Sequence, residues 1–105
     1  MQTILFLCTG NYYRSRFSEI LFNHLARQGS FDWQAESRGL ALEQGRNNVG
    51  AISKYARQGL CDRNIQLPAD LRSPLPFTLA DLTHTQRVIA MDETEHRPLM
   101  QAAAD

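Results

Sequence analysis

The sequence predicts an α/β fold, a three-layer sandwich in which a short and mostly parallel sheet is flanked by helices. Two observations carry this prediction. Segments of strand length alternate along the chain with stretches whose apolar residues recur at helical spacing. Glycines and prolines separate these segments and mark the turns between them. In sheets of this kind, functional residues are expected beyond the carboxyl ends of the strands.

The first predicted unit is a strand followed by a helix. Thr3 to Leu7 form a compact apolar run that stops at Cys-Thr-Gly-Asn, as expected for a strand buried on both faces. From Ser15 the apolar residues recur at helical spacing, and Gly29 is placed to end this helix. Its aromatic residues Phe17 and Phe22 are candidates for the core.

The middle of the chain predicts a second strand and a second helix. Residues 33–40 are a weaker strand candidate that ends near Ser37-Arg38-Gly39, and residues 43–48 indicate a loop. Apolar residues then recur at helical spacing from Val49 onward, and Gly59 is placed to end the helix.

The last part of the chain predicts a final strand and helix after a proline-rich connection. Thr78 to Asp81 resemble a capping box that opens a short helix. Residues 88–91 are short and apolar, which predicts a third strand, and Asp92 follows as a candidate helix N-cap. Pro98 either kinks the last helix or starts it afresh, with residues 99–104 as the helix proper.

Composition and charge exclude several classes of function. The chain has 105 residues, enough for one hydrophobic core but not two, so we expect a single domain over residues 1–105. Lys+Arg and Asp+Glu both number 11 and no basic cluster stands out, so nucleic acid is not an expected partner. No apolar run is long enough to span a membrane and no signal peptide is recognisable, so we expect a cytoplasmic protein with no membrane partner.

The two cysteines, Cys8 and Cys61, cannot form a disulfide framework. Together with three scattered histidines they show no zinc-ligand spacing, so neither a metal nor another cofactor is expected. We expect both thiols to be free, which makes their reactivity the question. Cys61 is interpreted as a small apolar residue near a helix end.

The segment from Cys8 to Ser15, CTGNYYRS, combines the features of an anion-binding loop with a nucleophile. If the loop curls round one centre, its backbone amides and the following helix N-terminus attract an oxyanion. Arg14 can present two N–H groups to a phosphate, and Ser15 can donate a hydrogen bond to the sulfur. Gly10 and Asn11 tolerate the positive φ angles that such a loop requires. The predicted phosphate-binding residues are Thr9, Gly10, Asn11, Tyr12, Tyr13, Arg14 and Ser15.

The chemistry predicted for this loop is phosphoryl transfer to Cys8. The sulfur attacks phosphorus in line, the loop stabilises the equatorial oxygens, and water later hydrolyses the cysteinyl-phosphate. A cysteine followed by an arginine after five residues is a weak motif alone, but here a strand precedes it and a helix follows. The alternative is an inert thiol buried at the end of a strand.

The segment LFLCTGNYYRSRFSE resembles the N-terminal signature of the low-molecular-weight protein-tyrosine phosphatases, which they share with thioredoxin-coupled arsenate reductases. Further matches are Glu19, the Ser-Arg-Gly at residues 37–39 and the segment VIAMDETEHRPL. The resemblance implies a fold of this phosphatase type and hydrolysis of phosphotyrosine or aryl phosphate monoesters. It also implies roles for four residues: Cys8 as nucleophile, Arg14 as phosphate clamp, Asn11 as the residue that holds the loop, and Ser15 as thiolate stabiliser.

Two residues depart from the family pattern inside the signature. Tyr13 stands where the family has a second cysteine, so a protective disulfide with Cys8 cannot form at that position. Arg16 replaces the proline that usually opens the first helix. Tyr12 is interpreted either as an aromatic contact at the mouth of the loop or as an ordinary packed or exposed tyrosine.

The end of the sequence departs further from the family pattern. The family has a later Asp-Pro loop whose aspartate protonates the leaving group, and no Asp-Pro occurs here, so the fold is expected to be C-terminally shortened. Asp92 is a candidate acid, but an N-cap is the better interpretation. We expect weak turnover, and self-association as a homodimer through an uncovered sheet edge.

Three functional hypotheses follow. The first is a phosphatase acting on a phosphotyrosine protein or a small aryl phosphate, with affinity for phosphate, sulfate and vanadate-like anions. The second is a degenerate oxyanion- or phosphoprotein-binding module, and the third is an arsenate reductase, which would need more cysteines than this sequence has. Other polar residues have ordinary interpretations: His24 as packed, His84 and His96 as surface residues, and Arg38 as a salt-bridged side chain or a second substrate contact.

Overall fold

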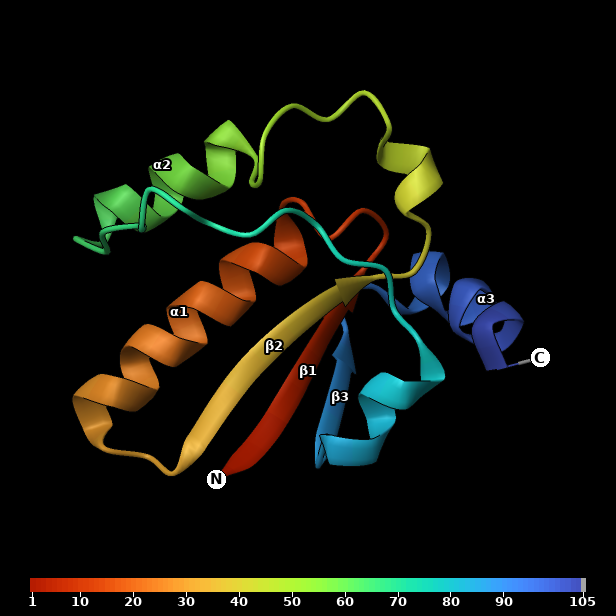
Figure 1. The fold of residues 1–105 in the computed structure, drawn as a ribbon, viewed down its shortest axis with the longest axis horizontal. Helices are drawn as coiled ribbons and strands as arrows, with labels where there is room; N and C mark the ends of the chain where they lie inside the picture. Colours follow the sequence, from red (N-terminus) through yellow and green to blue (C-terminus); the bar gives the residue numbers. More distant parts are fainter. Residues whose placement is uncertain (105) are drawn as a thin grey trace.

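The computed structural model describes residues 1–104 (Figure 1). Three strands alternate with three α-helices, and two short 3-10 helices lie in the connections. In chain order the elements are β1 (Gln2–Cys8), α1 (Arg14–Gly29), β2 (Trp33–Gly39), η1 (Leu42–Gly45), α2 (Lys54–Asp62), η2 (Leu79–His84), β3 (Arg87–Ala90) and α3 (Glu93–Ala104).

The strands form one parallel sheet in the order β2-β1-β3, which confirms the predicted α/β class. The register pairs Cys8 with Gly39, and Leu7 with Ala90. The carboxyl ends of all three strands therefore meet at one edge of the sheet. Strand β1 occupies the centre, and residues 3–8 are buried, as predicted for a strand covered on both faces.

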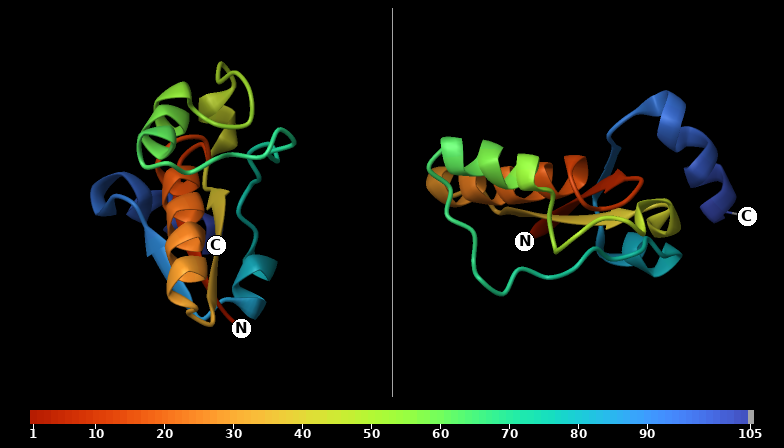
Figure 2. Two further views of the ribbon diagram at one scale, coloured as in Figure 1. Left: turned by 90° about the vertical axis from the view of Figure 1, so that its left-hand side faces the viewer. Right: turned by 90° about the horizontal axis from the view of Figure 1, so that it is seen from above.

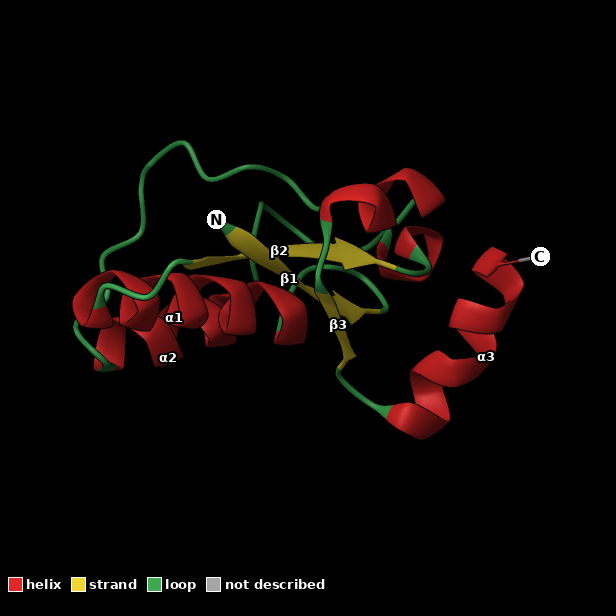
Figure 3. Cartoon of the chain, turned by 90° about the horizontal axis from the view of Figure 1, so that it is seen from below, coloured by secondary structure: helices red, strands yellow, loops and turns green. Residues whose placement is uncertain are grey.

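The predicted layers are present, but the two outer layers differ in kind. Helix α1 covers one face of the sheet and α2 lies beside it. On the other face, the connection of residues 63–78 and η2 form a thinner layer (Figures 2 and 3). Helix α3 lies beyond the carboxyl end of β3, at the same edge of the sheet as the end of β1 (Figure 1).

Two apolar clusters fix α1 in place. Phe22 packs against the cluster that contains Ile4, Phe6 and Ala35 of the sheet. On its other side, α1 packs Phe17 and its apolar neighbours against a cluster formed by α2 and by residues before and after it. Both predicted aromatic core residues thus contribute to packing. The first turn of α1 is held in one position above the end of β1.

Helix α2 begins later and ends later than the sequence pattern predicted. Ser53 is its N-cap, and the Ser53 hydroxyl accepts a hydrogen bond from the amide of Tyr55 at 3.1 Å. Val49 is exposed and Gly50 has a φ of 81°, so residues 49–52 precede the helix. Gly59 lies inside the helix, where a Cβ would approach the Phe17 ring to 2.9 Å. Its role is close helix packing, and reading it as a helix stop was wrong.

Three further details correct or confirm the expected elements. Part of the expected loop at residues 43–48 forms η1, and the capping box of Thr78 and Asp81 is present at the start of η2. Helix α3 runs from Glu93 through Pro98, so a fresh start at the proline was wrong. The Asp92 carboxylate accepts a hydrogen bond from the Glu95 amide at 2.8 Å, which confirms its interpretation as a cap.

Strand β3 is an open edge within the described residues. It pairs with β1 on one side, and Val88 and Ile89 are 38% and 44% exposed. The pocket beside it, of about 490 Å³, is lined by Ala90 and residues of α3. In the part of the chain that the structure describes, no helix is long and apolar enough to cross a membrane.

Candidate active site

Cys8 is the last residue of β1 and is buried. Its sulfur lies 2.9 Å from the hydroxyl oxygen of Ser15, which belongs to the first turn of α1. The backbone oxygens of Cys8 and Thr9 accept hydrogen bonds from the amides of Leu40 and Ala41, which follow β2. The strand end and the helix start are thus tied together around the thiol, as the sequence predicted.

The loop between β1 and α1 keeps its backbone donors free. Among residues 1–104, no backbone or side-chain acceptor takes a hydrogen bond from the amides of residues 9–15. Asn11 adopts a φ of 49°, the left-handed conformation that Asn tolerates better than most residues. Successive free amides before a helix N-terminus are suited to binding an oxyanion.

Asn11 is fully buried and organises the loop from beneath. Its amide nitrogen donates to the hydroxyls of Ser15 and Ser37, at 2.8 Å each. Its side-chain oxygen accepts from Arg72 and from the amide of Leu75, at 3.0 Å each. The side chain of Asn11 therefore uses both of its polar ends in hydrogen bonds beneath the loop.

Two arginines lie behind this network, Arg16 buried and Arg72 half-buried. Arg72 donates to the carboxylate of Glu19 at 3.1 Å, and Glu19 also accepts a hydrogen bond from Ser37. Burial lowers the pKa values of Arg16 and Arg72, although Glu19 opposes the shift in both. Arg16, which replaces the family's proline, is 3.8 Å from Glu19, and its Nε and Nη1 atoms make no hydrogen bond with the described residues.

Gly39 allows the end of β2 to approach the loop closely. A Cβ at this position would lie 2.9 Å from the backbone oxygen of Thr9 and 3.0 Å from the backbone nitrogen of Asn11. It would also meet the side chain of Leu42 at 2.2 Å. Only a residue without a side chain fits here.

A cavity of about 220 Å³ opens above Cys8. Its lining comes from the predicted loop and from the segment around η1, which sequence reasoning had missed because it has no periodic or motif signal. Arg14 is the only Lys or Arg among the lining residues, and none of them is Asp or Glu. They are Cys8, Thr9, Gly10, Tyr12, Tyr13, Arg14, Gln44, Gly45 and Asn48.

Arg14 lies at the start of α1 and is paired with Glu95 of α3. Its Nη1 and Nη2 atoms donate to the two carboxylate oxygens at 3.1 and 2.7 Å, a parallel two-point contact. Both side chains are 42% exposed. The hydrogen bond from Arg14 is the main cause that lowers the pKa of Glu95 to about 2, and that from Thr9 adds to it. The same contact raises the pKa of Arg14.

Glu95 has two more partners besides Arg14. Thr9 donates its hydroxyl hydrogen to the carboxylate, and the Nε2 atom of His96 lies 3.0 Å from it. His96 is fully buried, so its interpretation as a surface residue was wrong. The Nδ1 atom of His96 lies 3.1 Å from the amide nitrogen of Asp92 and accepts its hydrogen, which leaves Nε2 to donate.

The two tyrosines of the loop line the mouth of the cavity. The Tyr13 ring stacks with that of Tyr55 of α2, with ring centroids 6.4 Å apart. The Tyr12 hydroxyl donates to the backbone oxygen of Val49 at 2.6 Å. Both rings thus connect the loop to the segment around α2.

The whole chain matches a known protein family. Residues 3–105 match the family model described as low molecular weight phosphotyrosine protein phosphatase. The chain belongs to this family. Comparison with curated protein sequences gave no match.

Several solved structures have the same fold. The low molecular weight protein tyrosine phosphatase of T. tengcongensis is 25% identical with a TM-score of 0.81, and the alignment covers 100% of this chain and 68% of that one. Wzb of Vibrio vulnificus in complex with benzylphosphonate is 20% identical with a TM-score of 0.78, covering 98% and 66%. The YwlE arginine phosphatase of Bacillus subtilis is 22% identical with a TM-score of 0.79, covering 98% and 63%.

At identities of 20% and 22%, the likeness to Wzb and YwlE concerns the fold. The chain spans 63–68% of the length of these three proteins. The match of residues 3–105 to the family model establishes the family, and the solved structures establish the fold.

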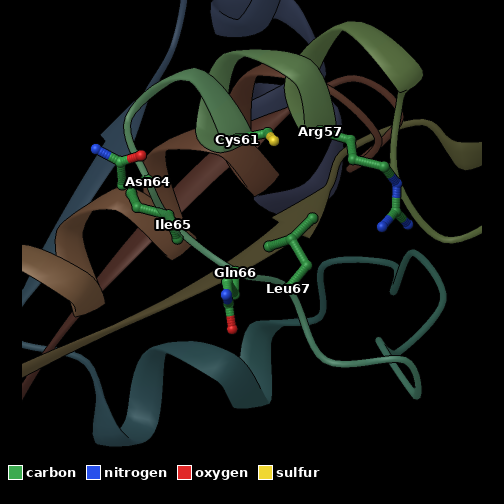
Figure 4. Close-up of a pocket in the computed structure, with 6 residues that line it drawn as sticks. All are labelled: Arg57, Cys61, Asn64, Ile65, Gln66 and Leu67. Atoms are coloured by element: carbon green, nitrogen blue, oxygen red, sulfur yellow. The ribbon is translucent and has the colours of Figure 1, made fainter.

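The structure brings the predicted loop residues together and separates them from Cys61. Cys61 is exposed, which contradicts its interpretation as a packed apolar residue, and it lines a different pocket of about 530 Å³ (Figure 4).

Arg38 forms salt bridges with Asp81 and Glu36, in agreement with the first of its two interpretations. Within residues 1–104, no group of three His, Cys, Asp or Glu side chains is spaced to hold a metal ion.

Proposed function

We propose that this phosphatase-family chain hydrolyses phosphotyrosine or aryl phosphate monoesters through a cysteinyl-phosphate intermediate on Cys8. One observation carries the proposal: a buried thiol lies 2.9 Å from the Ser15 hydroxyl, next to seven consecutive loop residues whose amides are free. A thiolate accepting a hydrogen bond from Ser15 is a good nucleophile. The free amides, with Arg14, provide donors for the equatorial oxygens of the transferring phosphoryl group.

The proposed reaction has two steps. In the first, the Cys8 sulfur forms a bond to phosphorus while the bond from phosphorus to the aryl oxygen breaks, and the leaving oxygen takes its proton from water. In the second, a water molecule attacks phosphorus, the phosphorus–sulfur bond breaks, and inorganic phosphate leaves with Cys8 returned as thiolate. Neither step requires a metal ion or a redox partner. The loop and Arg14 hold the phosphoryl oxygens through both steps.

The leaving group determines how well this site turns over. No acidic residue lies among those that line the cavity, so the described residues provide no evident proton donor for a phenol. General acid catalysis contributes about 10² to 10⁴ in rate. We therefore propose that aryl phosphates with acidic phenols, which need no proton donor, are the better substrates. Tyr12 and Tyr13 at the mouth of the cavity supply aromatic surface for the aryl ring.

Burst kinetics test this proposal. Rapid mixing with p-nitrophenyl phosphate is expected to release nitrophenol in a burst that approaches one equivalent, if hydrolysis of the intermediate is slow. Cys8→Ser should abolish the burst, and Arg14→Ala should lower kcat/KM by about 10² to 10³ because a donor to the phosphoryl oxygens is lost. Acid quenching during the burst should trap a phosphate on Cys8, detectable by mass spectrometry.

Cys61→Ser is the matched control, because it removes the other thiol from a separate pocket. This variant is expected to keep the wild-type burst. Loss of the burst in Cys61→Ser, or a protein that shows neither a burst nor vanadate binding, would contradict the assignment to Cys8.

A binding module with weak turnover is the second candidate. Two observations favour it: the charge of Arg14 is engaged by Glu95, and no acidic residue among residues 1–104 lines the cavity. A burst without steady turnover would select this candidate, and Cys8→Ser would then still bind oxyanions. Arsenate reduction has less support, because Cys61 lines a separate pocket and the sequence contains no third cysteine.

Two further parts of the proposal concern location and assembly. Both thiols are free, which agrees with a reducing compartment such as the cytoplasm. The open edge of β3, with Val88 and Ile89 partly exposed, supports association of two copies through the sheet. The proposed ligands are phosphotyrosine proteins or small aryl phosphates, and phosphate, sulfate or vanadate-like anions.

A further inference from the structure

The charge balance of the loop depends on a residue that comes from the far end of the chain. Arg14 is the only Lys or Arg that lines the Cys8 cavity, and Glu95 forms a two-point ion pair with it. We propose that Glu95 is a resident counter-anion of Arg14 that lowers the affinity of the loop for oxyanions, and lowers it more for dianions than for monoanions. This inference rests on the proposed function, because it assumes that the loop binds phosphate.

Glu95 is held against Arg14 from three directions. Arg14 itself binds both carboxylate oxygens, Thr9 donates a hydrogen bond from the loop, and His96 supports the carboxylate from the same helix. His96 is fully buried and its other ring nitrogen is engaged by the amide of Asp92, so it cannot turn away without losing that bond. A carboxylate with these contacts stays beside the loop at neutral pH.

The two-point contact uses part of the guanidinium. Glu95 occupies the edge formed by Nη1 and Nη2, and the Nε atom has no hydrogen-bond partner among the described residues. An oxyanion in the cavity can therefore still reach Arg14 along the Nε and Nη2 edge. It would then lie on the neighbouring edge of the guanidinium, about 7 Å from the Glu95 carboxylate.

At that distance the repulsion is large enough to measure. Two unit charges about 7 Å apart in a half-exposed site change a binding constant by about 3- to 10-fold, and the logarithm of this factor doubles for a dianion. The charge of Arg14 does not offset this effect, since the ion pair with Glu95 is present before the ligand binds. Weaker binding of dianions also hastens release of the inorganic phosphate product.

The experiment compares two ligands of the same shape and different charge. Benzylphosphonate carries two negative charges at about pH 8, and benzylsulfonate carries one; neither is hydrolysed. Titration calorimetry of the full chain with each ligand gives their dissociation constants. Glu95→Gln is expected to lower the dissociation constant of benzylsulfonate by about 3-fold or more and that of benzylphosphonate by about 10-fold or more.

Two variants serve as controls for this comparison. Glu93→Gln removes the same charge from the same helix, but Glu93 is 74% exposed and pairs with Arg97, so both constants should stay at wild-type values. Glu95→Asp keeps the charge with a shorter reach, and its affinities should lie much closer to wild type than those of Glu95→Gln. This variant also separates loss of charge from damage to the fold.

The outcomes distinguish the inference from the proposed function. If wild type binds benzylphosphonate and Glu95→Gln binds both ligands with unchanged or weaker affinity, Glu95 is not a counter-anion, and the phosphatase proposal stands. Equal tightening of both ligands, or an equal effect of Glu93→Gln, would also overturn the inference. If neither wild type nor Glu95→Gln binds benzylphosphonate, the loop is not a phosphate site and both proposals fail.

Discussion

At the scale of single residues, the contact between Arg14 and Glu95 makes stability depend on pH. The pKa of Glu95 is lowered to about 2 from an ordinary value of 4.5, chiefly by the hydrogen bond from Arg14. A carboxylate with a lower pKa in the folded state stabilises that state above the unfolded pKa, and this contribution disappears as the pH falls through the folded pKa. The contribution is therefore complete above about pH 5 and is lost only below about pH 2.

We expect denaturation experiments to detect the contribution of the Arg14–Glu95 ion pair to the free energy of unfolding. The difference in free energy of unfolding between wild type and Glu95→Gln should be largest near pH 6 and should shrink steadily as the pH falls from about 5 to 2. Urea denaturation at a series of pH values measures this difference. A gap that stays constant over this range would mean that Glu95 does not titrate with the lowered pKa.

Which site residues could be predicted depends on their distance along the chain. Cys8, Asn11, Arg14 and Ser15 lie in one segment between a strand and a helix, so their spacing alone indicated a shared site. The residues that complete the network come from elsewhere. Arg72 lies 61 residues from Asn11, and Glu95 lies 81 residues from Arg14. No local pattern marks such partners, because only the folded sheet brings them to the loop.

At the scale of elements, the stability of helix α3 depends strongly on the hydrogen bonds of its first turn. Its only proline, Pro98, lies inside the helix and cannot donate a backbone hydrogen bond. Asp92 supports the N-terminus of the helix. Its carboxylate accepts a hydrogen bond from the Glu95 amide, and its own amide donates one to the His96 ring. The cap therefore both starts the helix and orients the residues that contact the loop.

We expect Asp92→Ala to destabilise the protein by about 0.5–2 kcal/mol, the usual cost of losing an N-cap. Thermal or urea denaturation at neutral pH measures the loss. Asp70→Ala, the same substitution at an exposed position in the connection before η2, should stay within about 0.5 kcal/mol of wild type. Equal stability of the two variants would show that Asp92 is not a structural cap.

Element type was easier to predict from sequence than element ends. The apolar run of β1 and the periodic spacing of α1 identify both elements, because burial on two faces or on one stripe leaves a clear pattern. Gly59 was read as the end of α2 because glycine often ends helices. A glycine is needed at this position because the Phe17 ring of α1 packs against it. This contact joins two separate helices, and no pattern in the sequence indicates it.

At the scale of the whole molecule, the open edge of β3 is the surface where we expect copies of the chain to associate. Strand β3 has no neighbour on its outer side among the described residues, and an open strand can pair with another chain. Lysine on an edge strand opposes such pairing. We expect wild-type protein to self-associate with rising concentration and Ile89→Lys to remain monomeric, as measured by sedimentation velocity.

Leu25→Lys is the control for this prediction, because Leu25 is an exposed apolar residue on α1 and lies away from β3. It should associate like wild type. If both variants fail to associate, self-association depends on general surface hydrophobicity and not on the edge of β3. If wild type stays monomeric at every concentration, pairing through this edge is contradicted.

Gly39 has a consequence for how this protein tolerates sequence change. The space between the end of β2 and the loop after Cys8 is kept free by the absence of a side chain, and every other L-amino acid would place its first carbon against the backbone atoms of Thr9 and Asn11. No choice of rotamer can relieve that collision, because the Cβ position is fixed by the backbone. Hydrophobic positions in the core can exchange residues of similar volume, whereas position 39 admits no substitute without a shift of the loop. The shape of the loop after Cys8 therefore depends on a residue that contributes no functional group.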